Sequence, residues 1–337
     1  MDWFDQVPKV ELHVHLEGAI PYPALWELIQ KYGGAPEIPD MDTLLRKLVY
    51  KDFPEFIETW IWKNRFIREY EDFTFIAEQV AIDWVNQNIK YAETFYCPSD
   101  FRRIGLNPQQ ITLAIRQGLS RVPEIEIALI ADLCRDDGPE QGAKTLAAVN
   151  EVKSLGVIGI GIGGSEQRYP PEPYKPVYEQ AREFGFYTSA HAGEAAGADS
   201  IWGAIKELKV DRIGHGTRAE EDEQLLDYLA ESKIPIELCP ISNVRTGVIP
   251  SLESHPVRRY FEKGLVITIN SDDPKMFGNS VSEEYRELEQ CFGFTKPELQ
   301  TLILQGIHAS WLPPEKKLQL TDSFIKNPIW QVGLPNH

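Results

Sequence analysis

The sequence contains too few basic residues for a protein that binds a polyanion. Its 337 residues include 34 lysines and arginines against 51 aspartates and glutamates, which gives a formal net charge of −17. A field of this sign repels phosphate backbones and anionic lipid headgroups, and the pair Arg102-Arg103 is too small a basic cluster to override it. We therefore expect neither nucleic acid nor a membrane surface among the partners.

Cysteine and long apolar runs are also scarce. The four cysteines are far apart and include no C-x-x-C pair, which excludes a disulfide scaffold and favours a reducing compartment. No apolar run approaches the roughly 20 residues that a membrane helix needs. The acidic start MDWFDQVPKVE lacks the apolar core of a signal peptide. These absences predict a cytoplasmic protein.

What the sequence does contain is a recurring unit, a short β-rich run followed by a helical stretch. The eight runs lie at residues 9–16, 91–99, 125–135, 157–166, 187–194, 211–217, 235–243 and 265–274. Segments between them have helical patterns, for example 108–122 and 220–233. Strands that alternate with helices predict a parallel sheet, and eight of them favour a closed barrel over an open sheet.

The predicted fold is therefore an α/β (β/α)8 TIM barrel that forms a single domain over residues 1–337. The length alone allows two domains, but such barrels commonly exceed about 250 residues. An extra helical insert at about 41–89 follows the first strand, and further helices follow the last. This insert, with Trp60 and Trp62 among its aromatics, is either a lid or specificity wall or a packed cap of the barrel.

Polar side chains gather where the eight runs end. The residues at or just past these ends are His13, His15, Glu166, His191, Glu194, His215, Asn243, Asp272 and Asp273. In (β/α)8 barrels the carboxyl ends of the strands carry the active site. The pattern thus predicts one site assembled from distant parts of the chain.

The pair His13-Val14-His15 is the first candidate for a metal site. Residues i and i+2 of a strand face the same side, and neutral imidazole is a common zinc ligand. A lone H-x-H is more often a pair of polar residues on an exposed strand. Here the flanking residues are apolar, so two imidazoles on a buried strand would be costly without a partner.

The other candidates each have a structural alternative. His191 suits a third ligand and Glu194 a proton donor, or both merely end a strand. His215 lies between glycines, which let another group approach its ring closely, or it is an ordinary core histidine. Asp272 and Asp273 follow the last apolar run. Asp272 suits a metal ligand there, or the two acids form the N-cap of a helix. Closure of the eighth strand onto the first would bring Asp272 beside His13.

Four of the seven histidines fall at strand ends, and we assign no role to His255, His308 or His337. The segment Gly159–Gly164 formally matches G-x-G-x-x-G. Its glycines alternate with isoleucines inside a strand, and a proline-rich stretch rather than a helix follows, so a dinucleotide site is excluded. The sequence also lacks a G-x-S-x-G elbow and a P-loop lysine.

Five segments in order, VELHVHLEGAI, HAGE, RIGHGT, CPISN and SDDP, closely resemble the adenosine/adenine deaminase branch of the amidohydrolase superfamily. The resemblance covers nearly the whole chain, and the ordered combination is highly specific. It implies a (β/α)8 barrel that holds one zinc ion per chain. The ligands that it implies are His13, His15, His191 and Asp272, with water in the open position.

The resemblance also implies roles for the neighbouring residues. His215 would act on the water as base or as electrostatic orienter, and Glu194 would give a proton to N1 of a purine. The residues expected to contact the substrate are His15, Glu17, Gly164 (through its backbone N–H, at N3) and Asp273 (at N7). The implied partner is a small-molecule purine, and the sequence indicates no oligomeric state.

The substrate has a default and several alternatives. The default is adenosine or deoxyadenosine, converted to inosine or deoxyinosine and ammonia. Glu17 replaces the aspartate of typical adenosine deaminases, and 161–166 fits neither the adenosine nor the adenine pattern, so adenine and 5′-modified adenosines such as aminodeoxyfutalosine are alternatives.

Two more remote hypotheses remain. The protein is an amidohydrolase that cleaves another kind of bond, or it is a degenerate family member that binds a ligand without catalysis. Two-metal relatives carry a carboxylated lysine on the fourth strand, and VIGIGIGGSE has none. Every expected ligand and acid is present, which argues against a degenerate binding protein.

Overall fold

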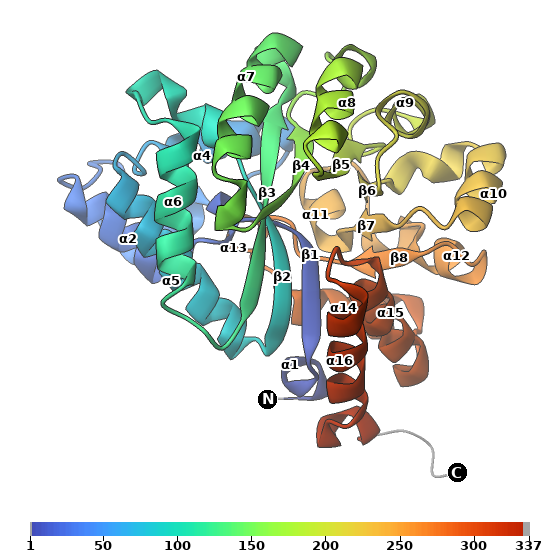
Figure 1. Ribbon diagram of the computed structural model, residues 1–337. Coiled ribbons are helices and arrows are strands. Elements are labelled where there is room, and N and C mark those ends of the chain that lie inside the picture. The colour runs from blue at the N-terminus through green and yellow to red at the C-terminus, as the bar shows by residue number, and fades with distance from the viewer. Residues whose placement is uncertain (1, 333–337) are drawn as a thin grey trace.

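Eight parallel strands form a barrel in the computed structural model, which describes residues 2–332 (Figure 1). Neighbouring strands in the barrel follow chain order, as a (β/α)8 fold requires. The strands are β1 (Lys9–His15), β2 (Ile89–Tyr96), β3 (Glu126–Cys134), β4 (Val157–Gly163), β5 (Tyr187–Ala192), β6 (Arg212–His215), β7 (Ile236–Leu238) and β8 (Ile267–Ile269). The predicted fold class is confirmed.

Helices surround the barrel and return the chain from the end of each strand to the start of the next. Those that connect successive strands from β2 to β8 are α6 (Pro108–Leu119), α7 (Gly138–Glu151), α8 (Lys175–Glu183), α9 (Ala198–Gly203), α10 (Glu223–Ser232), α11 (Pro240–Arg245) and α12 (Val257–Glu262). None of the helices within residues 2–332 is long and apolar enough to cross a membrane.

Helical additions lie at both ends of the barrel sequence. A short helix, α1 (Trp3–Gln6), precedes β1. The segment between β1 and β2 contains α2 (Tyr22–Lys31), α3 (Met41–Lys47), α4 (Phe53–Asn64) and α5 (Tyr70–Asn86), so the predicted insert at 41–89 is helical. After β8 come α13 (Pro274–Phe277), α14 (Val281–Phe292), α15 (Lys296–Ala309) and α16 (Pro314–Ile325). Of these, α15 packs against β8 and β1.

Two predicted strands are longer than the observed ones. The runs 235–243 and 265–274 contain only the three-residue strands β7 and β8. Their polar ends turn into α11 and α13, which begin at Pro240 and Pro274. Proline lacks the N–H that a strand ladder needs and suits the first turn of a helix, which explains why a helix begins at Pro240 and at Pro274. β8 itself ends earlier, at Ile269.

The barrel closes where the end of the chain's last strand meets the first. Beyond β8, the N–H of Asp272 donates to the carbonyl of His13 at 3.0 Å, and the N–H of His15 donates to the carbonyl of Asp272 at 2.9 Å. These bonds continue the parallel ladder between Val14 and Asp272. The predicted proximity of Asp272 to the histidine pair is therefore confirmed, and the backbone enforces it.

A buried ion cluster fills the barrel interior next to this closure. The guanidinium of Arg212 lies 2.5 Å from a carboxylate oxygen of Glu93 and 2.5 Å from one of Glu237, and all three side chains are almost fully buried. The ring of Trp311 packs 3.7 Å from the same guanidinium. Because a buried carboxylate is costly without a partner, Arg212 allows Glu237 to stand in the barrel core.

Candidate active site

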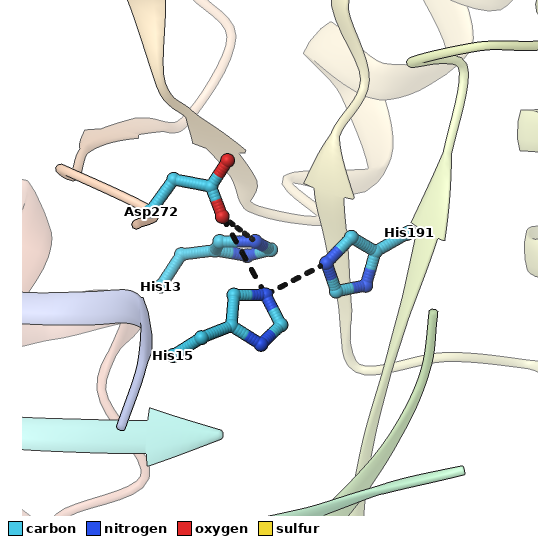
Figure 2. Close-up of side chains that lie close together, drawn as sticks. All are labelled: His13, His15, His191 and Asp272. Atoms are coloured by element: carbon cyan, nitrogen blue, oxygen red, sulfur yellow. Dashed lines mark hydrogen bonds and ion pairs between the residues drawn. The ribbon is translucent and has the colours of Figure 1, made fainter. Parts of the chain in front are cut away.

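Three imidazoles and one carboxylate converge at the carboxyl ends of β1, β5 and β8 (Figure 2). The Nε2 atoms of His15 and His191 are 3.2 Å apart. Oδ1 of Asp272 lies 3.5 Å from Nε2 of His15 and 3.7 Å from Nε2 of His13. All four potential ligand atoms lie within 4.8 Å of one another. The structure therefore brings together the four residues that the sequence predicts as a metal site.

Contacts behind the rings orient their free nitrogens toward the centre of the cluster. Nδ1 of His13 lies 2.7 Å from a carboxylate oxygen of Glu237, and Nδ1 of His191 lies 3.1 Å from the carbonyl of Ile162. Both partners accept, so each ring carries its proton on Nδ1 and presents a lone pair at Nε2. Ser242 donates to Oδ2 of Asp272 at 2.6 Å, which leaves Oδ1 facing the rings.

This donor set fits a zinc ion. Nε2 of His13 is buried and has no hydrogen-bond partner among the described residues, which a bound cation would supply. Burial and the neighbouring histidines lower the pKa of His13 and His191, and burial lowers that of His15 to about 3, so the rings are neutral. Neutral imidazole nitrogens and a carboxylate oxygen are ligand types that zinc takes in proteins.

Two of the site's residues have an uncommon backbone conformation. His215 and Asp272 adopt left-handed backbone conformations, with φ of 59° and 64°. Such conformations are uncommon outside glycine and persist where surrounding contacts impose them. Gly214, beside His215, has His13 Cε1 only 2.9 Å from where a Cβ would be. The sequence left open which group approaches His215 closely beside these glycines. In the structure that group is the ring of His13.

Glu194 is a buried carboxyl group beside His215. Its Oε2 lies 3.6 Å from Nε2 of His215. Burial, and then the nearby charge of Glu166, raises the pKa of Glu194 to about 8. At neutral pH the group is therefore largely the protonated acid, the form that can give a proton to a ligand.

Glu166 holds the loop that carries Glu194, a function that the sequence does not reveal. Its carboxylate accepts from the N–H groups of Gly193 at 2.6 Å, Glu194 at 3.2 Å, Ala195 at 2.7 Å and Ala196 at 2.9 Å. Carboxylates that accept several backbone N–H bonds are strongly held. Glu166 thus links the end of β4 to the loop after β5.

Glu17 and Asp273 lie on the side of the cluster formed by the β1 and β8 loops. One oxygen of Glu17 accepts from the N–H of Cys97 at 3.1 Å, whereas Oε2 of Glu17 and Oδ1 of Asp273 are buried without a partner among the described residues. Asp273 packs directly on Gly18, where a Cβ would lie 1.7 Å from Oδ1. Burial raises the pKa of Glu17 to about 7 and that of Asp273 well above its usual range.

The remaining predicted contact, Gly164, follows β4 with φ of 103° and is exposed at the mouth of the barrel. Ser165 beside it is bound to Asp136 through its N–H at 2.9 Å and its hydroxyl at 2.6 Å. The contact between the backbone N–H of Gly164 and N3 of the purine stays a prediction.

The sequence interpretation missed Lys63 and Asp132 near the site, and it named Trp60 only as an aromatic residue of the helical insert. Lys63 of α4 is buried and donates to the carbonyl of Glu17 at 2.6 Å, and the ring of Trp60 lies edge-on to His15 at 6.2 Å. Asp132 stands buried in β3 with an unpartnered oxygen. The sequence did contain a sign of Asp132, because it is a charged residue inside the apolar run IALIADLC. Burying a charged side chain without a partner costs free energy, so such a residue indicates a function. Lys63 left no such signal, because α4 reaches the site only through tertiary packing.

The fold and this site define a (β/α)8 hydrolase of the amidohydrolase type, and comparison with known proteins gives its family. A sequence model described as adenosine deaminase matches residues 8–327. The chain belongs to the adenosine deaminase family of the amidohydrolase superfamily, and it is a hydrolytic deaminase.

Two similar relatives carry different substrate names. An adenine deaminase of Chlorobium phaeobacteroides is 34% identical, with 94% of this chain and 96% of the relative covered. An aminodeoxyfutalosine deaminase of Streptomyces coelicolor is 32% identical, with 94% of this chain and 83% of the relative covered. The relatives thus agree on the reaction and differ on the substrate.

Solved structures agree with this assignment. An adenine deaminase from Arthrobacter aurescens superposes with a TM-score of 0.90 at 27% identity, covering 94% of this chain and 98% of its own. An amidohydrolase from Burkholderia ambifaria with bound zinc superposes with a TM-score of 0.87 at 28% identity, covering 96% and 90%. The second of these shows that a similar chain holds zinc.

Removing one predicted ligand tests the metal site. We expect Asp272→Ala to weaken zinc binding at least 100-fold, because it removes the only oxygen ligand and leaves three neutral nitrogens. Zinc per chain, measured by mass spectrometry after dialysis against a zinc buffer, checks this. The matched control is Asp273→Asn, which should keep wild-type zinc content. Full zinc retention in Asp272→Ala would rule out its place in the ligand set.

Proposed function

We propose that the protein hydrolyses the 6-amino group of a purine to a 6-oxo group and ammonia, with one zinc ion held by His13, His15, His191 and Asp272. The observation that carries this proposal is Glu194, a buried acid whose raised pKa keeps its proton beside the metal-binding cluster. The absence of lysine from β4 supports a single metal.

The reaction needs an electrophilic ring and an activated water. Zinc in this site would supply water of lowered pKa, about 7, at neutral pH. Glu194 donates its proton to N1 of the purine, which makes C6 electrophilic. The water oxygen forms a bond to C6, and the bond from C6 to the amino nitrogen then breaks.

The protons must balance during these steps. The amino group leaves as ammonia and therefore takes up one proton, while the water gives up both of its protons as C6 becomes a carbonyl. His215 and Glu194 are 3.6 Å apart, and one of them takes the first of these protons. Which of the two does so depends on where His215 carries its own proton.

Unpartnered buried oxygens support a substrate that donates hydrogen bonds and carries no phosphate. Glu17, Asp132 and Asp273 each leave one buried carboxyl oxygen without a partner among the described residues. Purines offer ring N–H and amino donors for such oxygens, and the formal net charge of −17 disfavours the approach of a phosphate. A nucleotide is therefore a poor fit for this site.

Adenine is our leading candidate for the substrate. The relatives reported above are named for adenine or aminodeoxyfutalosine, which favours the two alternatives over adenosine, the default that the sequence suggested. Adenine is supported further by the Arthrobacter aurescens structure, which is named for adenine. The second candidate is aminodeoxyfutalosine, for which the Streptomyces coelicolor relative is named, and Glu17 agrees with either candidate because the resemblance expects it in both kinds of deaminase.

The role of Glu194 predicts the behaviour of its amide variant. We expect Glu194→Gln to lower kcat with adenine by at least 100-fold, because the amide cannot protonate N1, while zinc content stays at the wild-type level. Ammonia release by the zinc-loaded variant checks this. The matched control is Glu172→Gln, a surface carboxyl in the β4–β5 connection, which should keep wild-type kcat. Wild-type turnover in Glu194→Gln would remove Glu194 from the mechanism.

A substrate panel separates the candidates. We predict that kcat/KM for adenine or aminodeoxyfutalosine exceeds that for adenosine by more than about tenfold, and that AMP is the poorest of the four. Initial rates measured at one zinc loading give the comparison. A preference for adenosine would restore the default, and efficient turnover of AMP would contradict the phosphate-free pocket.

A further inference from the structure

A chain of three buried side chains extends from His215 away from the catalytic cluster. Nδ1 of His215 lies 3.2 Å from Nδ2 of Asn243. Oδ1 of Asn243 lies 3.2 Å from Nε2 of His255, and the N–H of Val257 donates to Nδ1 of His255 at 3.2 Å. The three side chains come from β6, α11 and the segment before α12, and all are at most 4% exposed.

The far end of this chain has only one possible proton arrangement. The backbone N–H of Val257 can only donate, so Nδ1 of His255 must accept. Burial, and then the neighbouring His215, lowers the pKa of His255 to about 3, so its ring is neutral and carries its single proton on Nε2. That proton is donated to Asn243, whose atom at this position must be the oxygen. Thr217 donates its hydroxyl to the same oxygen at 2.9 Å.

The amide of Asn243 therefore turns its NH2 group toward His215. An amide NH2 only donates, so Nδ1 of His215 must be an acceptor without a proton. We propose that Asn243 and His255 are positioning residues that hold neutral His215 in the tautomer with its proton on Nε2, so that His215 donates into the active site. The effect of this tautomer on catalysis rests on the proposed function, whereas the assignment of the tautomer rests on the hydrogen bonds alone.

This tautomer decides between the two roles that were open for His215. A ring with its proton on Nε2 has no lone pair at that atom, and its Nδ1 already accepts from Asn243, so His215 cannot act as a base toward the site. His215 then orients the attacking water as a hydrogen-bond donor. The first proton of the water goes instead to the Glu194 carboxylate, which has given its own proton to N1, and passes from there to the departing amine. The second proton, lost as C6 becomes a carbonyl, restores the acid form of Glu194.

The tautomer can be observed directly in the zinc-loaded protein. Long-range proton–nitrogen correlation spectra of protein with ¹⁵N-labelled histidine distinguish the two neutral forms, and loss of one signal set in His255→Gln and in His215→Gln assigns the rings. We expect both His215 and His255 to carry their protons on Nε2. A proton on Nδ1 of wild-type His215 would overturn the proposal, whatever the activity.

Exchanging the amide for an acid should reverse the tautomer. In Asn243→Asp the side chain can only accept, so we expect the proton of His215 to move to Nδ1. With it, kcat should fall at least 100-fold with little change in KM and with zinc content retained. The matched control is Thr217→Val, which removes the other donor to Oδ1 of Asn243 but leaves His255, so that His215 should keep its proton on Nε2.

These measurements separate the inference from the proposed function. If Asn243→Asp moves the proton to Nδ1 of His215 without lowering kcat, the positioning role is wrong. If wild-type protein shows the predicted tautomers but does not deaminate adenine or aminodeoxyfutalosine, the hydrogen-bond chain stands and the proposed function fails. A Thr217→Val spectrum with the proton of His215 on Nδ1 would also count against the role of His255.

Discussion

The site depends on one pair of backbone hydrogen bonds, those between Asp272 and the two histidines of β1. They place a carboxylate from near residue 270 beside imidazoles from the start of the chain, and they hold Asp272 in a left-handed conformation, which is uncommon outside glycine. His191 joins the cluster because the barrel brings β5 across from β1. A metal bound by all four side chains would in turn stabilise this closure, since it would link side chains from the first and last strands of the barrel.

Burial then determines the protonation of every group in the site. Loss of solvation disfavours charge, so it lowers the pKa of the imidazoles and raises that of the carboxyl groups. The same cause therefore supplies neutral ligands in His13, His15 and His191 and a protonated acid in Glu194. Hydrogen bonds refine the result, because Glu237, Ile162 and Asn243 select which nitrogen of each ring carries the proton.

The sequence predicted the barrel and the cluster because both depend on local periodicity and order. His13 and His15 share a strand face, and the ends of parallel strands meet at one face of a barrel. The ends of β7 and β8 were less predictable, since each predicted run also contains the residues that turn into the next helix. The orientation of His255 toward Asn243 had no local signal, because its neighbours come from other loops. Buried atoms without a partner among the described residues, such as Glu17 Oε2, can be identified only in the folded chain, so the sequence could not predict them.

The central claim is that this site adds water to C6 of a purine and releases the amine. Its most direct test is to incubate the zinc-loaded protein with adenine in ¹⁸O-enriched water, and to measure the purine product by mass spectrometry and ammonia in the same samples. The account predicts hypoxanthine labelled with one ¹⁸O atom, in equal amount to ammonia. Unlabelled hypoxanthine, or ammonia without hypoxanthine, would contradict it.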